Sequence, residues 1–256
     1  MTISKLSTGN RSLMLAYDQG LEHGPADFNE RNCDPEYILD IAKKGKFNAV
    51  ILQKGVAQKY WDGKIPLVLK LNGKTNLVAG EPMSPQICSV KEAVEMGASA
   101  VGYTIFLGSA NEYQIFKEFS AIQEEAKRHY LPVIAWVYPQ GNAIKSATER
   151  SIMAYAARVG LELGADILKL KCGNNLDDLK WALQNAGKAK VMIAGGFREG
   201  EKEFLTHAQE IMQVGAYGMA IGRNIWQHRE PHKMAAAVRR IVIEGKDAEE
   251  GLKLLK

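Results

Sequence analysis

Short apolar runs recur along the chain, and each is followed by a turn signal and then by a segment with helical periodicity. Eight of these runs have the length and composition of buried strands: Leu13–Asp18, Ala49–Gln53, Leu67–Leu71, Ala100–Thr104, Val133–Tyr138, Asp166–Lys171, Val191–Gly195 and Tyr217–Gly222. Helices are predicted between them, at Pro35–Lys44, Val90–Met96, Glu112–His129, Thr148–Leu163, Leu176–Gln184, Lys202–Val214 and Pro231–Glu244. The connection from Lys54 to Pro66 has the weakest helical pattern.

Three of the predicted helices end in Gly-Ala immediately before a strand, in MGASAVGYT, LGADILKLK and VGAYGMAIG. A glycine at a helix C-terminus adopts the left-handed conformation at little cost. We therefore expect Gly97, Gly164 and Gly215 to end their helices and turn the chain into the next strand.

Eight strand–helix units within 256 residues predict an α/β fold, a (β/α)8 TIM barrel with a closed, parallel, eight-stranded sheet. No segment rich in Pro, Gly or Ser divides the chain, so residues 1–256 are expected to form a single domain. A doubly wound open sheet is the alternative, because periodicity does not reveal whether the sheet closes. In such barrels the chemistry lies at the carboxyl ends of the strands.

Composition places the chain among ordinary globular domains, with 46% apolar and 24% charged residues. The net charge of +4 is spread along the chain, which does not favour nucleic acid as a partner. The longest apolar stretch, Tyr130–Pro139, is about half of the ~20 residues that cross a bilayer, and the N-terminus lacks the apolar region of a secretory signal. We expect no membrane association and a cytoplasmic location.

A metal site is not expected from the cysteines and histidines. The three cysteines, Cys33, Cys88 and Cys172, form no CxxC pair and suggest no disulfide framework. His228 and His232 are four residues apart, but a proline separates them and no third ligand stands nearby. We expect this histidine pair to be solvated.

The sixth run, Asp166–Lys171, contains the most informative residues. Side chains alternate across a strand, so Lys169 and Lys171 share one face while Leu168 and Leu170 share the other. If the leucines pack on helices outside the barrel, both lysines point inward. Buried lysines require carboxylate partners, or their pKa values fall and one becomes a neutral amine that can attack a carbonyl.

Other strand ends carry groups that suit such chemistry. Trp136 and Tyr138 share a face of the fifth run; Trp136 taken alone is typical of a core residue, whereas the Tyr138 hydroxyl at the strand end can act as an acid or base. Asp18 ends the first run, where it either caps a turn or balances the lysines. His23 follows it in a position to donate a hydrogen bond to a substrate.

Glycine turns end the seventh and eighth runs, and the loops after these strands are the usual phosphate site of the barrel. The residues concerned are Ala194, Gly195, Gly196, Gly222 and Arg223. A tight turn explains one Gly-Gly pair, but two glycine turns on adjacent strands, one with an arginine, favour a phosphate site. Lys54, Lys74 and Lys145 are weaker candidates for a second anion site.

The chain resembles the archaeal-type class I fructose-1,6-bisphosphate aldolases of the DhnA-like group. The motifs LAYDQGLEHGPADF, LVLKLNGKT, ASAVGYTIFLGS, WVYPQG, GADILKLK and AIGRNIWQ carry the resemblance, from about Leu13 to Val242. It implies a (β/α)8 barrel, no metal, no cofactor, and a lysine on the sixth strand that forms a Schiff base with the substrate.

Applied motif by motif, the resemblance implies that Lys169 forms the Schiff base and that Tyr138 transfers protons. Trp136 and Asp18 resemble residues that shape and polarise the site. Substrate contacts are implied for His23, Asp27, Gln140, Lys171, Ala194, Gly195, Gly196, Gly222 and Arg223. Gln140 stands where relatives have an arginine, and Cys172 stands where a tyrosine can occur.

The function that the resemblance implies is reversible cleavage of fructose 1,6-bisphosphate, a lyase reaction of glycolysis and gluconeogenesis. It also implies a phosphorylated sugar as the substrate and a ring-like homo-oligomer such as a decamer. One alternative within the family is an aminodideoxyheptulosonate synthase, but that branch reads DHGVSxGP where this chain reads DQGLEHGP. A zinc-dependent aldolase and a non-catalytic sugar-phosphate binding protein are the alternatives of other classes.

Overall fold

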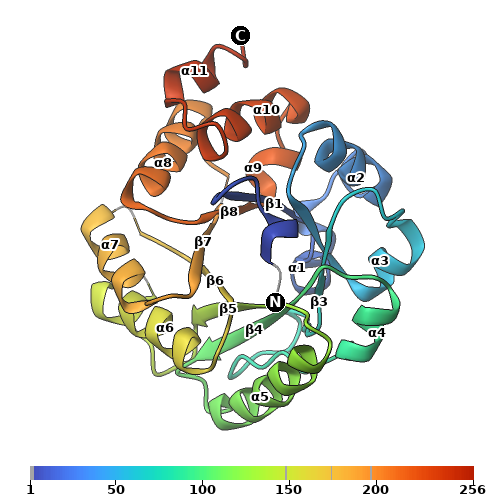
Figure 1. Cartoon of the computed structure of the whole chain (residues 1–256), viewed down its shortest axis with the longest axis vertical. Coiled ribbons are helices and arrows are strands. Elements are labelled where there is room, and N and C mark those ends of the chain that lie inside the picture. Colours follow the sequence, from blue (N-terminus) through green and yellow to red (C-terminus); the bar gives the residue numbers. More distant parts are fainter. Residues whose placement is uncertain (1–2, 148, 174, 197) are drawn as a thin grey trace.

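The computed structural model describes residues 3–147, 149–173, 175–196 and 198–256. Within them, eight parallel strands pair in sequence order, and the last pairs with the first to close the barrel (Figure 1). The strands are β1 (Ser12–Ala16), β2 (Ala49–Gln53), β3 (Leu67–Lys70), β4 (Ala100–Leu107), β5 (Val133–Pro139), β6 (Ile167–Leu170), β7 (Lys190–Ala194) and β8 (Gly218–Ile221). The predicted (β/α)8 barrel is confirmed, and the open sheet is excluded.

The helices form a ring around the barrel (Figure 1). They are α2 (Pro35–Lys44), α3 (Lys54–Tyr60), α4 (Val90–Glu95), α5 (Glu112–Arg128), α6 (Arg150–Glu162), α7 (Leu176–Asn185), α8 (Glu201–Val214), α10 (Pro231–Val242) and α11 (Ala248–Leu252). Short helical turns are η1 (Ile3–Leu6), α1 (Gly20–His23), η2 (Gly24–Asp27) and α9 (Arg223–Trp226). The weak pattern after β2 forms only the short α3. Thr148, the predicted start of one helix, lies outside the described residues.

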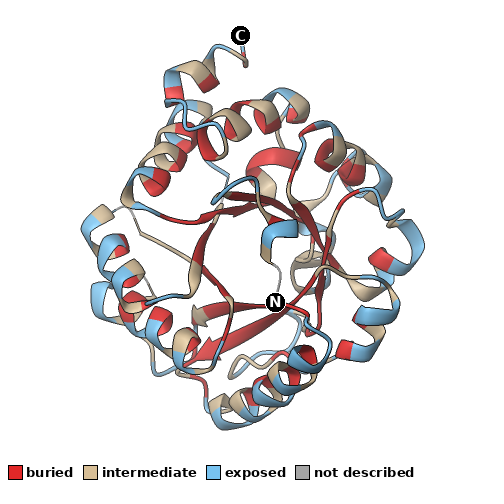
Figure 2. Ribbon diagram, viewed as in Figure 1, coloured by how far each residue is buried: buried red, intermediate tan, exposed pale blue. Residues whose placement is uncertain are grey.

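Two apolar clusters follow from the alternation of side chains along the strands. One fills the barrel and includes Met14, Ile51, Val68 and Ile167. The other lies between the barrel and the helices, where Leu168 and Leu170 pack. Strands and inward helix faces are buried, while the outward helix faces are exposed (Figure 2).

The N-terminal segment closes one end of the barrel. Leu6 of η1 is fully buried and belongs to the cluster inside the barrel. The Ser12 hydroxyl donates a hydrogen bond of 2.6 Å to the Leu6 carbonyl oxygen, which fixes this segment against β1. The η1 turn accordingly lies over the barrel in Figure 1. The site described below occupies the opposite end.

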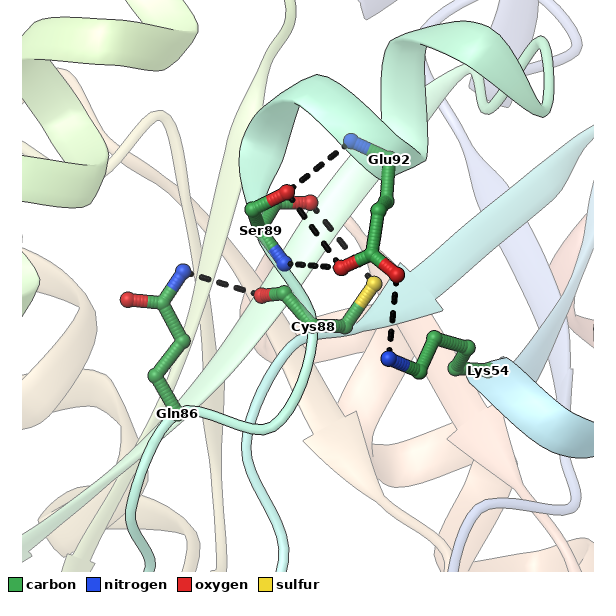
Figure 3. A network of polar contacts seen from close by, with 5 residues as sticks. All are labelled: Lys54, Gln86, Cys88, Ser89 and Glu92. Carbon is green, nitrogen blue, oxygen red and sulfur yellow. Dashed lines mark hydrogen bonds and ion pairs between the residues drawn. The ribbon is translucent and has the colours of Figure 1, made fainter.

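Local signals define where the helices begin and end. The Ser89 hydroxyl accepts a hydrogen bond from the Glu92 amide, and the Glu92 carboxylate accepts one from the Ser89 amide, so a capping box starts α4. The same carboxylate accepts a 3.0 Å hydrogen bond from Lys54 Nζ, which joins α4 to α3 (Figure 3). These contacts lower the pKa of Glu92 to about 2.

The predicted glycine turns adopt the left-handed conformation. Gly97, Gly164 and Gly215 have φ angles of 77°, 83° and 105°. Each follows a helix and leads into the next strand. In the described residues no helix is both long and apolar enough to cross a membrane.

Candidate active site

Lys169 lies near the carboxyl end of β6, where it is in register with Trp136 of β5. Its side chain is inside the barrel, and only 6% of the residue is exposed. The Nζ atom lies 5.0 Å from the centroid of the Trp136 ring. The predicted inward direction of this lysine is confirmed, since the leucines on either side pack against the helices.

Burial is the main cause of the lowered pKa of the Lys169 amine. It lowers the pKa of the amine to about 8, against the opposing effect of the Asp18 carboxylate. Two neighbouring cations lower the pKa further, first Lys70 and then Lys171. A substantial fraction of Lys169 is therefore a neutral amine just above neutral pH, as nucleophilic attack requires.

Lys171 and Tyr138 form a second pair in the mouth of the barrel. Lys171 Nζ lies 4.7 Å from the centroid of the Tyr138 ring. Burial lowers the pKa of Lys171, with Glu22 opposing and Arg223 contributing to the decrease. Burial raises the pKa of Tyr138 well above its usual value, and the carboxylate of Asp18 adds to the increase. Tyr138 is therefore an un-ionised phenol at neutral pH.

Asp18 lies two residues beyond β1, at the end of the barrel that holds the lysines. Its carboxylate acts on Lys169, Lys70 and Tyr138, which fits the expected charge balance better than a capped turn. A second carboxylate, Glu22 of α1, acts on the same groups. Sequence reasoning missed Glu22, because the short helix that carries it has no distinctive pattern.

Lys70 at the end of β3 was also missed. It is 5% exposed, and its Nζ lies 5.3 Å from the centroid of the same Trp136 ring that Lys169 approaches. Alternation along LVLK places Lys70 on the face of Val68, which lines the barrel interior. The signal that reveals Lys169 and Lys171 was therefore present here too.

The predicted phosphate residues lie together after β7 and β8. Gly196 has a φ of 69°, and its carbonyl oxygen accepts a hydrogen bond of 3.4 Å from the Arg223 guanidinium. At two of these positions the packing by itself requires glycine, because no β-carbon fits there. A β-carbon would lie 2.9 Å from the Ile221 side chain at Gly195, and 2.8 Å from the Ala16 carbonyl oxygen at Gly222. Ala194, the last residue of β7, is half-buried beside them.

His23 and Asp27 extend this group from the β1 side. The His23 Nδ1 and the Asp27 carboxylate are 2.6 Å apart, and the other oxygen of that carboxylate lies 3.6 Å from the Arg223 guanidinium. The Gln227 side chain donates a 2.8 Å hydrogen bond to the Asp27 carbonyl oxygen. Residues of the first and last strand–helix units thus meet at one edge of the barrel mouth.

Two residues singled out in the sequence, Gln140 and Cys172, make none of the contacts that join His23, Asp27 and Arg223. Gln140 directly follows β5 and is exposed, outside the contacts described above. Cys172 is half-buried, and its Sγ lies 3.7 Å from Nε2 of His207. Burial and the Glu199 carboxylate raise the pKa of the Cys172 thiol to about 12, so it is not an activated nucleophile.

The expectation of a solvated histidine pair is wrong for His228. Its side chain is only 7% exposed, and its Nε2 lies 2.9 Å from the carboxylate of Glu201, the first residue of α8. His232 Nε2 lies 3.5 Å from Asp40 instead. Across the described ranges no three His, Cys, Asp or Glu side chains are grouped so that they could hold a metal ion.

Comparison with known proteins fits this geometry. Residues 12–228 match the model of the DeoC/LacD family aldolases. The chain is 47% identical over 245 residues to a class 1 fructose-bisphosphate aldolase of Thermoproteus tenax, covering 94% of this chain and 93% of the relative. It is 37% identical to a fructose-bisphosphate aldolase/6-deoxy-5-ketofructose 1-phosphate synthase of Methanocaldococcus jannaschii, covering 96% and 86%.

A solved structure extends the comparison to the lysine. It is an archaeal fructose-1,6-bisphosphate aldolase whose catalytic lysine is covalently bound to the carbinolamine intermediate of the substrate. The two chains superpose with a TM-score of 0.92 at 45% identity, covering 94% of this chain and 97% of that one. With a closed barrel, a buried lysine of lowered pKa and these relatives, the chain belongs to the DeoC/LacD family of aldolases.

Proposed function

We propose that this protein is a class I fructose-bisphosphate aldolase, which cleaves fructose 1,6-bisphosphate reversibly through a Schiff base on Lys169. The observation that carries the proposal is the buried amine of Lys169, with a pKa lowered to about 8, at the catalytic end of the barrel. The relatives support it, since they are named class 1 fructose-bisphosphate aldolases and reach 47% identity over nearly the whole chain.

Schiff-base formation comes first. The neutral amine of Lys169 attacks the C2 ketone of the open-chain substrate, and a proton moves from nitrogen to oxygen to give a carbinolamine. Tyr138 donates its phenolic proton to the C2 hydroxyl, which leaves as water. The products of this step are an iminium on Lys169 and a Tyr138 phenolate. The positive iminium favours the phenolate that its formation creates.

Cleavage follows from the iminium. The Tyr138 phenolate takes the proton of the C4 hydroxyl, the C3–C4 bond breaks, and glyceraldehyde 3-phosphate leaves. The bonding electrons move into the iminium, so an enamine remains on Lys169. Tyr138 returns the proton to C3 and is again a phenolate. The addition of one water to the new iminium releases dihydroxyacetone phosphate and the neutral amine, and the proton set free in this step restores the Tyr138 phenol. The same steps in reverse form the bond for gluconeogenesis.

The neighbouring residues have supporting roles in this proposal. The Asp18 carboxylate balances the charge of the lysines and orients substrate hydroxyls. Trp136 forms the wall against which the Lys169 side chain lies. Its buried indole Nε1 meets no hydrogen-bond acceptor among the described residues. Lys171 adds positive charge beside Tyr138.

One substrate phosphate is assigned to the loops that follow β7 and β8 at the rim of the barrel. This phosphate contacts the glycine loops with Ala194, Gly195, Gly196, Gly222 and Arg223, because backbone amides and a guanidinium suit an oxyanion. His23 and Asp27 contact the substrate beside them. Gln140 contacts it as an uncharged amide, which makes a weaker phosphate contact than the arginine of relatives.

Reductive trapping tests the proposal. Dihydroxyacetone phosphate and borohydride, with EDTA present, should leave one substrate-derived adduct per chain, located by mass spectrometry on Lys169. Lys169→Ala should lose both adduct and turnover, whereas Lys171→Ala should still form an adduct, more slowly. An adduct on another residue would overturn the assignment, and a wild-type protein without any adduct would favour a metal-dependent or purely binding function.

The identity of the sugar is tested by a cleavage assay with fructose 1,6-bisphosphate and fructose 1-phosphate. The bisphosphate should react with the higher kcat/KM, since one phosphate contact is lost with the monophosphate.

We also propose a cytoplasmic location and a ring-like homo-oligomer. Sedimentation velocity of the purified chain tests the oligomer, whose sedimentation coefficient should be well above that of a 28.2 kDa monomer.

A further inference from the structure

Lys70 has no part in the mechanism above, although its side chain ends in the same mouth of the barrel. Its Nζ donates a hydrogen bond of 3.3 Å to the Asn72 carbonyl oxygen, which also accepts one of 3.1 Å from Gln53. The Asn72 side chain is itself fixed, because it is bonded to both backbone groups of Thr104 and to the Ser84 carbonyl oxygen. Lys70 is therefore held in one place by a rigid, buried acceptor.

Lys70 and Lys169 approach the same aromatic ring. Their Nζ atoms lie 5.3 Å and 5.0 Å from the centroid of Trp136, and the two residues are 5% and 6% exposed. An aromatic ring attracts one cation readily, but two cations that share one buried ring repel each other with little screening by water. A pair of amines so placed disfavours the doubly protonated state.

The surrounding charges do not remove this repulsion. The charged groups that act on Lys169 are Asp18 in the loop after β1, Glu22 of α1, Lys70 of β3 and Lys171, which directly follows β6. Two carboxylates thus lie around three lysines. If all three amines were protonated, their positive charge would exceed the negative charge of the carboxylates.

Resting on the function proposed above, we propose that Lys70 is a positioning residue for the imine chemistry: its fixed cation beside Trp136 biases Lys169 toward the neutral, nucleophilic amine. Lys70 acts through Lys169 and does not itself react. The pKa of Lys169 agrees with this role, since Lys70 is the first of the neighbouring cations to lower it, ahead of Lys171 just after β6. Burial lowers the pKa of Lys70 as well, and the carboxylates of Asp18 and Glu22 oppose that decrease.

Three substitutions separate the charge of Lys70 from its hydrogen bond. Lys70→Met removes both, Lys70→Gln removes the charge but keeps a donor for the Asn72 carbonyl oxygen, and Lys70→Arg keeps both. The measurement is kcat/KM for fructose 1,6-bisphosphate from pH 6 to 10, whose acid limb reports the protonation of the free enzyme. Unfolding by denaturant checks each variant, and borohydride trapping identifies the modified lysine.

The charge role predicts that Lys70→Met and Lys70→Gln behave alike. Their acid limbs move to higher pH by roughly one unit, which lowers kcat/KM at pH 7 about tenfold, and the deficit shrinks as the pH rises. Lys70→Arg keeps the wild-type acid limb. Trapping still modifies Lys169 in every variant.

Other outcomes would overturn the inference. An acid limb at the wild-type pH in both neutral variants shows that the Lys70 charge does not bias Lys169. A pattern in which Lys70→Gln and Lys70→Arg resemble wild type assigns only a hydrogen-bonding role. Failure of the proposed function is distinct from both, since it appears as a wild-type protein without an adduct on Lys169.

Discussion

The indole ring of Trp136 lies against the backbone of Gly102 on the neighbouring strand, so closely that no side chain fits between them. A β-carbon at Gly102 would lie 2.1 Å from two carbons of the six-membered part of the ring. Because Lys70 and Lys169 both lie against this ring, Gly102 sets the position of the surface that the two lysines share.

Gly102→Ala should displace the ring and destabilise the barrel. Overpacking of a close-packed interior costs about 1–3 kcal/mol, so the free energy of unfolding should fall by that amount, and turnover should fall as the lysines lose their wall. The double variant Gly102→Ala/Trp136→Phe removes the overlapping carbons and should recover part of the stability. Denaturant unfolding of both variants measures this, and an equally unstable double variant would contradict the explanation.

Lys169→Met should stabilise the protein at neutral pH while abolishing turnover. The lysine has a pKa of about 8 when folded and 10.5 as its ordinary value, so the folded chain binds fewer protons between these limits and its stability rises with pH there. Below pH 8 the buried charge costs about 3 kcal/mol, which the methionine removes. The gain in unfolding free energy should shrink between pH 8 and 10.5.

Lys91→Met on the exposed side of α4 is the matched control and should change stability little at any pH. A Lys169→Met protein no more stable than wild type at pH 7 would show that burial of this amine is not costly.

Tyr138→Phe should lower kcat by about 10²–10⁴-fold with little effect on unfolding, because the ring and its packing remain while the transferable proton is lost. The trapped adduct should still form, more slowly, since Lys169 is intact. Tyr155→Phe, exposed on α6, serves as the control. A decrease in kcat below about threefold would exclude Tyr138 from proton transfer.

Arg223→Ala should raise KM for the bisphosphate by about 10–100-fold, the effect of one lost charge-assisted contact, with kcat changed less. Arg229→Ala, three-quarters exposed on the neighbouring turn, should leave KM near the wild-type value. Steady-state kinetics at fixed ionic strength measure both. An unchanged KM in a folded Arg223→Ala protein would place the phosphate elsewhere.

Much of this molecule follows from local sequence patterns. The period-2 alternation in GADILKLK places Lys169 and Lys171 on one face, and the eightfold strand–helix repeat predicts the parallel sheet. Helix boundaries such as Pro35–Lys44 are correct because caps and periodicity act within a few residues. The same patterns ended the fourth strand at Thr104, whereas β4 is buried throughout and runs to Leu107.

Relations across the barrel could not be obtained in this way. Lys70 and Lys169 are separated by almost a hundred residues, and only closure of the sheet brings β3 and β6 to the same ring. The lowered pKa of Lys169 likewise depends on burial and on the charges of Asp18, Glu22 and Lys70, which are distant from it in the sequence. Strand alternation is a property of neighbouring peptide units, whereas desolvation and Coulomb interactions depend on distances through space that the closed barrel alone establishes.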